Sequence, residues 1–279
     1  MLKPLDPLAQ KWHDKLLETI EPHRKKPLLL SGGVDSATLL AALLELGERP
    51  ECYTFRLGAT DSTDVRVARR ICKDWNLKIH VLKIERSLDV LVSDVRQVIK
   101  LLNTSKKASV QCAQPIMYMC ERMHSDGFDS AIVGTGAVVL DDKRVAILAS
   151  QQGEGAARAY RAEKLNDKNT DCGTGRMHQM ARLMGIELAE PYSEEPLGSF
   201  ALAIDYAELN RPRQKGMALR AFPEFYKRGY WRRNSSLQVN SGVREWHDTL
   251  LKTEYNTRNS KRVVAIYNDM RKEIKDAMA

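Results

Sequence analysis

A short turn near the start of the chain carries the residue types best suited to chemistry. Residues 31–36 read Ser-Gly-Gly-Val-Asp-Ser, after an apolar run at residues 28–30 and before the apolar start of a helix. A strand-to-helix junction with two glycines presents several backbone N–H groups to one point, where the positive end of the helix dipole adds to them. We therefore expect this turn to bind a phosphate group.

The residues of the turn differ in what they contribute to such a site. Gly32 and Gly33 can adopt backbone conformations barred to other residues, and they leave no Cβ between the main chain and an anion. Ser31 and Ser36 add hydroxyl donors. Asp35 would repel a phosphate unless a cation lay between them, so its carboxylate predicts bound Mg²⁺.

A parallel sheet is expected to position the turn. Predicted strands cover residues 28–30, 52–55, 78–84 and 130–133, and predicted helices include residues 5–21, 63–76, 87–102 and 114–125. Strands separated by helices imply a doubly wound parallel sheet, an α/β fold whose ligands bind at the carboxyl ends of the strands. The turn at residues 31–36 and a second one, Gly134-Thr135-Gly136, both follow strands, so they can face a single site.

Composition limits the classes of protein. No run approaches the ~20 apolar residues of a membrane span, and the N-terminal stretch mixes charged with apolar residues, unlike a signal peptide. The five cysteines form no C-x-x-C pair, which suits reduced thiols, and we expect a cytoplasmic protein that needs no membrane. The net charge of +8 suits either an anionic nucleotide with an acidic substrate or a nucleic acid.

The turn and the residues after it resemble a known family. Ser31–Ser36 is similar to the pyrophosphate-binding loop of the ATP pyrophosphatase (PP-loop) superfamily, and roughly residues 27–225 resemble, with gaps, the synthetase domain of asparagine synthetase and β-lactam synthetase. The resemblance implies an adenine-nucleotide α-hydrolase-like fold with a helical C-terminal region. It also implies an ATP-dependent ligase that uses ATP and Mg²⁺, adenylates a carboxylate with release of pyrophosphate, and lets an amine displace AMP.

The resemblance assigns roles to particular residues. It makes Lys215, in a Lys-Gly-Met-Ala-Leu-Arg-Ala-Phe segment, a catalytic residue beside Asp35, because a compact ammonium is a suitable counter-charge for pyrophosphate. Asp35 is also the expected metal ligand, and Phe55 lies where the adenine edge is read. Arg176, Glu194 and Arg220 are the predicted substrate residues. The predicted ATP- and pyrophosphate-binding residues are Leu30, Ser31, Gly32, Gly33, Asp35, Ser36, Phe55, Gly134, Thr135 and Gly136.

The chain also departs from the family pattern. Thr135 replaces a glutamate of the second loop, and Val138 stands where a magnesium-binding aspartate is expected. Asp141 and Asp142 follow shortly after and are candidates to supply the missing carboxylate. Ala189 occupies the place of an arginine. The amino acid binding mode of asparagine synthetase is therefore in question.

We expect three parts in this chain: a helical extension at residues 1–26, the PP-loop ATP-binding core at residues 27–165, and a mostly helical substrate region at residues 166–279. Leu2 follows Met1 where a glutaminase domain would place its cysteine nucleophile. Ammonia, a separate amidotransferase or another amine is thus expected to supply the nucleophile. The expected partners are a small-molecule carboxylate and an amine donor.

Two other functions remain open at this level. A PP-loop enzyme can modify a tRNA or DNA base through an adenylated intermediate, and the basic, aromatic stretch at residues 211–233 would then hold the polymer. A silent nucleotide-binding protein is the third interpretation; the altered second loop permits it, whereas the intact Asp35 and Lys215 argue against it. Replacing Asp35 or Lys215 by alanine should abolish AMP formation with far smaller effects on folding.

Overall fold

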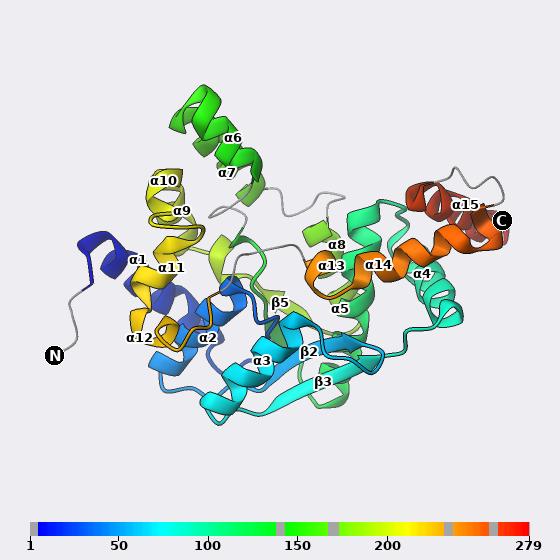
Figure 1. Ribbon diagram of the computed structural model, residues 1–279, viewed down its shortest axis with the longest axis horizontal. Coiled ribbons are helices and arrows are strands. Elements are labelled where there is room, and N and C mark those ends of the chain that lie inside the picture. Colours follow the sequence, from blue (N-terminus) through cyan, green and yellow to red (C-terminus); the bar gives the residue numbers. More distant parts are fainter. Residues whose placement is uncertain (1–4, 138–142, 167–172, 232–236, 257–261, 279) are drawn as a thin grey trace.

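Five parallel strands form the sheet of the computed structural model (Figure 1), which describes residues 5–137, 143–166, 173–231, 237–256 and 262–278. Their order is β3-β2-β1-β4-β5. The strands are β1 (Leu28–Leu29), β2 (Cys52–Leu57), β3 (Ile79–Ile84), β4 (Ser130–Ile132) and β5 (Glu187–Ala189). The chain order reverses at β1, between β2 and β4, which is the position where open α/β sheets bind ligands. The predicted doubly wound parallel sheet is confirmed.

Helices cover both faces of the sheet because successive strand side chains point to opposite sides. Leu28 belongs to one buried apolar cluster and Leu29 to the other. The first cluster draws on α1 (Pro7–Ile20), α2 (Val34–Glu45), α3 (Thr63–Asp74), α9 (Leu197–Ala203), α11 (Gly216–Ala221) and α12 (Pro223–Tyr226). The second draws on α4 (Leu88–Leu102), α5 (Lys107–Ser125), α8 (Gly173–Leu183), α14 (Val243–Asp248) and α15 (Val263–Asp276).

The remaining elements are short or lie outside the two layers. Figure 1 shows α6 and α7 extending away from the sheet, with α1 and α15 near opposite ends of the molecule. These elements are α6 (Lys143–Gln152), α7 (Glu154–Asn166), α10 (Tyr206–Leu209), α13 (Leu237–Asn240) and the 3₁₀ turns η1 (Glu21–His23), η3 (Pro191–Ser193), η4 (Thr249–Lys252) and η5 (Glu254–Asn256). None of the helices in the described ranges is long and apolar enough to cross a membrane.

Helix α1 is fixed to the part of the chain that carries the site. Asp6 begins it by accepting a hydrogen bond from the Ala9 N–H at 3.0 Å, which satisfies one of the free amides of the first turn. Its buried Trp12 packs against Tyr192 and Phe222, with ring centroids 6.5 and 6.4 Å apart. This N-terminal helix therefore supports the segment that delivers Lys215.

Two elements differ from the sequence prediction. Strand β5 was not predicted, because it has only three residues and begins at the exposed Glu187, so it lacks a clear alternation. Helix α5 begins at Lys107 rather than at residue 114. Pro115 lies inside this helix, although proline is tolerated best in the first turn.

Candidate active site

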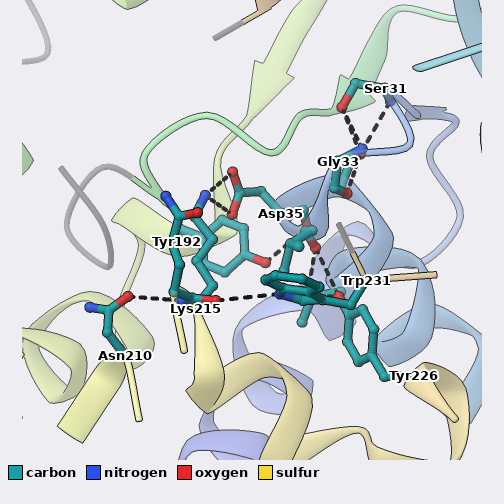
Figure 2. A network of polar contacts seen from close by, with 12 residues as sticks. Ser31, Gly33, Asp35, Tyr192, Asn210, Lys215, Tyr226 and Trp231 are labelled. Atoms are coloured by element: carbon teal, nitrogen blue, oxygen red, sulfur yellow. Dashed lines mark hydrogen bonds and ion pairs between the residues drawn. The ribbon is translucent and has the colours of Figure 1, made fainter. Parts of the chain in front are cut away.

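Hydroxyl groups brace the predicted phosphate loop from inside. The Ser31 and Ser36 Oγ atoms lie 3.1 Å apart, and Ser31 Oγ accepts a hydrogen bond from the Gly33 N–H at 3.2 Å (Figure 2). Gly33 is the N-cap of α2, so the amides of the following turn are the free donors that begin a helix. The loop thus holds a helix N-terminus at the carboxyl end of β1, as the sequence predicts.

Glycine is required at two positions because backbones meet there. Gly32 has a φ of +70°, and a Cβ on it would lie 2.6 Å from the Asp64 carbonyl oxygen of α3. A Cβ on Gly134 would lie 2.9 Å from the Ser36 backbone nitrogen. Gly32 therefore seats the loop on α3, and Gly134 brings the second loop into contact with the first.

A cavity of about 260 Å³ opens where these loops meet. Eight of the ten predicted nucleotide residues line it: Leu30, Ser31, Gly33, Asp35, Ser36, Phe55, Gly134 and Thr135. Gly32 packs on α3 instead, and Gly136 lies against Ser193. The cavity is large enough for part of a nucleotide, and its polar end is the helix N-terminus.

Sequence reasoning missed the apolar wall of this cavity. Ile116 and Met119 come from α5, Met177 from α8 and Leu237 from α13, which also places the polar Asn240 on the cavity wall. Helical apolar residues ordinarily belong to a core, so nothing local marks them as cavity residues. Tyr53 was detectable, because it lies two residues before Phe55 on the same face of β2.

Lys215 reaches the loop through an unusual backbone. Its φ of 57° is left-handed, and its N–H donates to Asn210 Oδ1 at 2.8 Å. The Lys215 Nζ lies 2.5 Å from both carboxylate oxygens of Asp35 (Figure 2). The Lys215 side chain is 3% exposed and that of Asp35 is 22% exposed. A lysine held in this conformation is pre-positioned, since such a backbone persists only where its surroundings enforce it.

Two buried tyrosines hold the start of α2 in place. Tyr192 donates its hydroxyl to the Asp35 carbonyl oxygen at 2.9 Å, and Tyr226 donates to the Val34 carbonyl oxygen at 3.1 Å. Burial raises the pKa of both phenols, so they stay protonated donors. Neither was predicted as a site residue, because both contacts join segments more than 150 residues apart.

The carboxylate of Glu190, the residue directly after β5, lies at the second loop. Thr135 Oγ1 donates to Glu190 Oε1, and His178 Nε2 lies 2.9 Å from the same oxygen. The side chains of Glu190 and His178 are 11% and 16% exposed. The position of the family glutamate is thus taken by a threonine that holds a carboxylate from the segment after β5. Val138, Asp141 and Asp142 lie outside the described residues.

The three predicted substrate residues are engaged away from the cavity wall. Arg176 donates to Gln179 at 2.5 Å, and Glu194 lies 2.6 Å from His23 Nε2. Arg220 donates to Asp6 Oδ2 at 2.9 Å, so it ties α11 to the start of α1. The geometry thus gives Arg220 the orienting role of a helix brace. Substrate binding by these three residues stays a prediction.

The comparisons with known proteins agree with this loop and sheet. Residues 26–137 match the family model described as asparagine synthase. That range includes β1, the Ser31–Ser36 loop, β2, β3, β4 and the second loop. The chain therefore contains a PP-loop domain of the asparagine synthase type over these residues, as the sequence resemblance implies.

More distant likenesses are short or weak. The 7-cyano-7-deazaguanine synthase of Rickettsia felis is 35% identical over 57 residues, 20% of this chain and 25% of that protein. The protein of the same name from Paramagnetospirillum magneticum is 40% identical over 53 residues, 19% and 23% of the two chains. The chain thus spans about a quarter of the length of these curated relatives.

A solved NMN synthetase from Francisella tularensis aligns over 87% of this chain and 92% of that chain, at 10% identity and a TM-score of 0.33. A TM-score this low says nothing about function. The family match over residues 26–137 indicates an ATP-using PP-loop domain.

Proposed function

We propose that this protein is an ATP-dependent ligase that adenylates a substrate carboxylate, releases pyrophosphate, and passes the acyl group to ammonia or another amine. The observation that carries the proposal is the Lys215–Asp35 pair, which lies at a helix N-terminus and whose Asp35 lines a cavity large enough for part of a nucleotide. The family match over residues 26–137 supports the same chemistry.

Lys215 would stabilise charge on the phosphates. Its ammonium is held by Asp35, and the free amides at the start of α2 point to the same region. Charge that develops on the pyrophosphate leaving group would be met by fixed donors, which need little reorganisation during the reaction. A lysine suits this role because its ammonium is a compact charge.

The donor set at Asp35 fits a magnesium ion carried by phosphates. Among the described residues no group of three or more histidine, cysteine or carboxylate side chains could hold a metal. Mg²⁺ is commonly bound by one or two carboxylates together with substrate phosphates. Asp35 is the residue that would hold it, and the ion would neutralise phosphate charge when bound.

Glu190 and His178 are placed to accept a proton. An amine nucleophile arrives protonated at neutral pH and must lose a proton before it attacks the acyl-adenylate. The hydrogen bond from Thr135 orients the Glu190 carboxylate at the second loop, and His178 contacts the same oxygen. We therefore assign this pair to the second half of the reaction.

The test is an ATP turnover assay with Mg²⁺ that separates AMP and pyrophosphate from ADP and phosphate. It is run with a panel of amino acids and ammonia, then with tRNA and DNA. AMP that appears only with a particular acid supports the ligase and identifies its substrate. ADP as the product, or no product with any acid, would overturn it, and AMP with nucleic acid alone would favour the base-modifying alternative.

A pair of lysine variants controls this assay. Lys215→Met removes the buried ammonium beside Asp35 and is expected to abolish AMP formation. Lys227→Met removes an ammonium that is 66% exposed and pairs with Glu224 on the surface. The second variant should leave AMP formation unchanged. Equal activity in the two variants would exclude Lys215 from the mechanism.

A further inference from the structure

The outer face of α3 carries a regular row of cations. Arg66, Arg69, Arg70 and Lys73 follow the i, i+3, i+4, i+7 spacing of one helix face, and all four are exposed. The opposite face is buried in the core. Neighbours at this spacing lie about 5–6 Å apart on a helix, so the row is an evenly spaced line of positive charge.

The segment after α12 extends this row beside the helix. Arg70 Nη2 donates to the Arg228 carbonyl oxygen at 2.5 Å. The Arg228 guanidinium lies 4.6 Å from the Trp75 ring centre, and the Arg70 guanidinium lies 5.5 Å from that of Tyr230. Contact with a ring restrains each guanidinium, and the N–H groups other than the Arg70 Nη2 donor can still turn toward a phosphate.

The row continues to the candidate active site. Arg213 lies 4.8 Å from the Trp231 ring centre, and Trp231 Nε1 donates to the Gln214 carbonyl oxygen at 3.4 Å. Figure 2 shows Trp231 beside Lys215. A polymer bound along this row would therefore have one end close to the Lys215–Asp35 pair, whose Asp35 lines the cavity.

Carboxylates compensate only part of the charge. Asp61 pairs with Arg69, and Asp74 lies 3.8 Å from Arg70. Within the described part of the chain, no carboxylate lies within 4.0 Å of the remaining cations of the row. These cations are Arg66, Lys73, Arg213 and Arg228. The surface is thus left with a net positive charge.

We propose that this cationic surface binds the sugar–phosphate backbone of a single-stranded nucleic acid. It comprises Arg66, Arg69, Arg70, Lys73, Arg213 and Arg228. Evenly spaced cations match a polymer with one charge per repeat, and a guanidinium fork matches the two free oxygens of a phosphate. Bases of an unpaired strand can stack on the outer faces of the Arg228 and Arg213 guanidinium groups, which lie over Trp75 and Trp231, and an acidic peptide has no such bases.

The experiment measures binding of a fluorescent 20-nucleotide single-stranded RNA, and of DNA of the same sequence, by anisotropy without ATP. It does not depend on turnover, so it can fail while the ligase proposal stands. The Arg70→Gln/Arg228→Gln double variant is expected to bind at least tenfold more weakly. The slope of log Kd against log salt concentration should fall by about 0.7 for each cation removed.

Matched variants separate a specific surface from general basicity and from misfolding. The Arg96 guanidinium also lies over a ring, 5.6 Å from the Tyr255 ring centre. It belongs to α4, whose buried residues pack in the second apolar cluster, away from the cationic surface. Arg96→Gln should bind like the parent. Lys73→Glu changes an exposed side chain with no stacked ring and should weaken binding even if the double variant fails to fold.

Three results would overturn the proposal. These are no binding of either nucleic acid near physiological salt, equal binding by Lys73→Glu and the parent, and competition by poly-glutamate as strong as that by RNA at equal charge. The last result would assign the surface to an acidic protein instead.

Discussion

The Lys215–Asp35 pair allows a prediction about stability as well as activity. The Lys215 side chain is 3% exposed, whereas that of Asp35 is 22% exposed. Asp35→Asn leaves an ammonium buried without its carboxylate, which costs about 3–5 kcal/mol of unfolding free energy. Lys215→Met leaves a carboxylate that water still reaches, so its cost should be smaller, about 1–3 kcal/mol. The free energy of unfolding should therefore be lower for Asp35→Asn than for Lys215→Met.

A double-mutant cycle in urea measures this asymmetry. The Asp35→Asn/Lys215→Met variant removes both charges, and we expect it to be more stable than the sum of the single effects by about 2 kcal/mol. Additive effects, or a larger loss for Lys215→Met than for Asp35→Asn, would refute the reasoning. All three variants should lose AMP formation. The pair adds a measurable stability cost to the expectation from sequence that alanine at either position affects folding far less than AMP formation.

Three further predictions follow from particular contacts. Gly134→Ala places a Cβ 2.9 Å from the Ser36 backbone nitrogen, so the rate of AMP formation should fall at least about a hundredfold. The control is Gly155→Ala in α7, where a Cβ meets open space, and this variant should keep full activity. Glu190→Gln should slow product formation from the amine but preserve pyrophosphate exchange into ATP, and an equal loss of both would contradict the proton-acceptor role. Burial lowers the pKa of His247 from 6.5 to about 3 in the folded protein. As pH falls below 6.5, His247 therefore takes up a proton in the unfolded protein but stays neutral in the folded protein, which favours unfolding. Stability should therefore drop by about 2 kcal/mol between pH 7 and pH 5 from this residue, as urea unfolding of the parent and His247→Gln would show; equal pH dependence of the two would contradict it.

The sequence by itself determined the sheet and the phosphate loop. Both depend on local patterns: apolar strands between amphipathic helices, and a glycine pair at a strand-to-helix junction. Leu30, Ser31, Gly33 and Asp35, the residues predicted to bind the nucleotide, line the cavity, and nucleotide binding by them stays a prediction. The three-residue strand β5 escaped prediction because it is too short to show a period.

The tertiary structure decided which distant residues complete the site. Tyr192 and Tyr226 reach the first turn of α2 from segments far along the chain, and Glu190 reaches Thr135 from the segment after β5. No local spacing encodes these contacts, because they depend on how the helices pack over the sheet. The same packing sets Asp35 against Lys215 across 180 residues, so that one ion pair contributes to both the stability of the fold and the proposed chemistry.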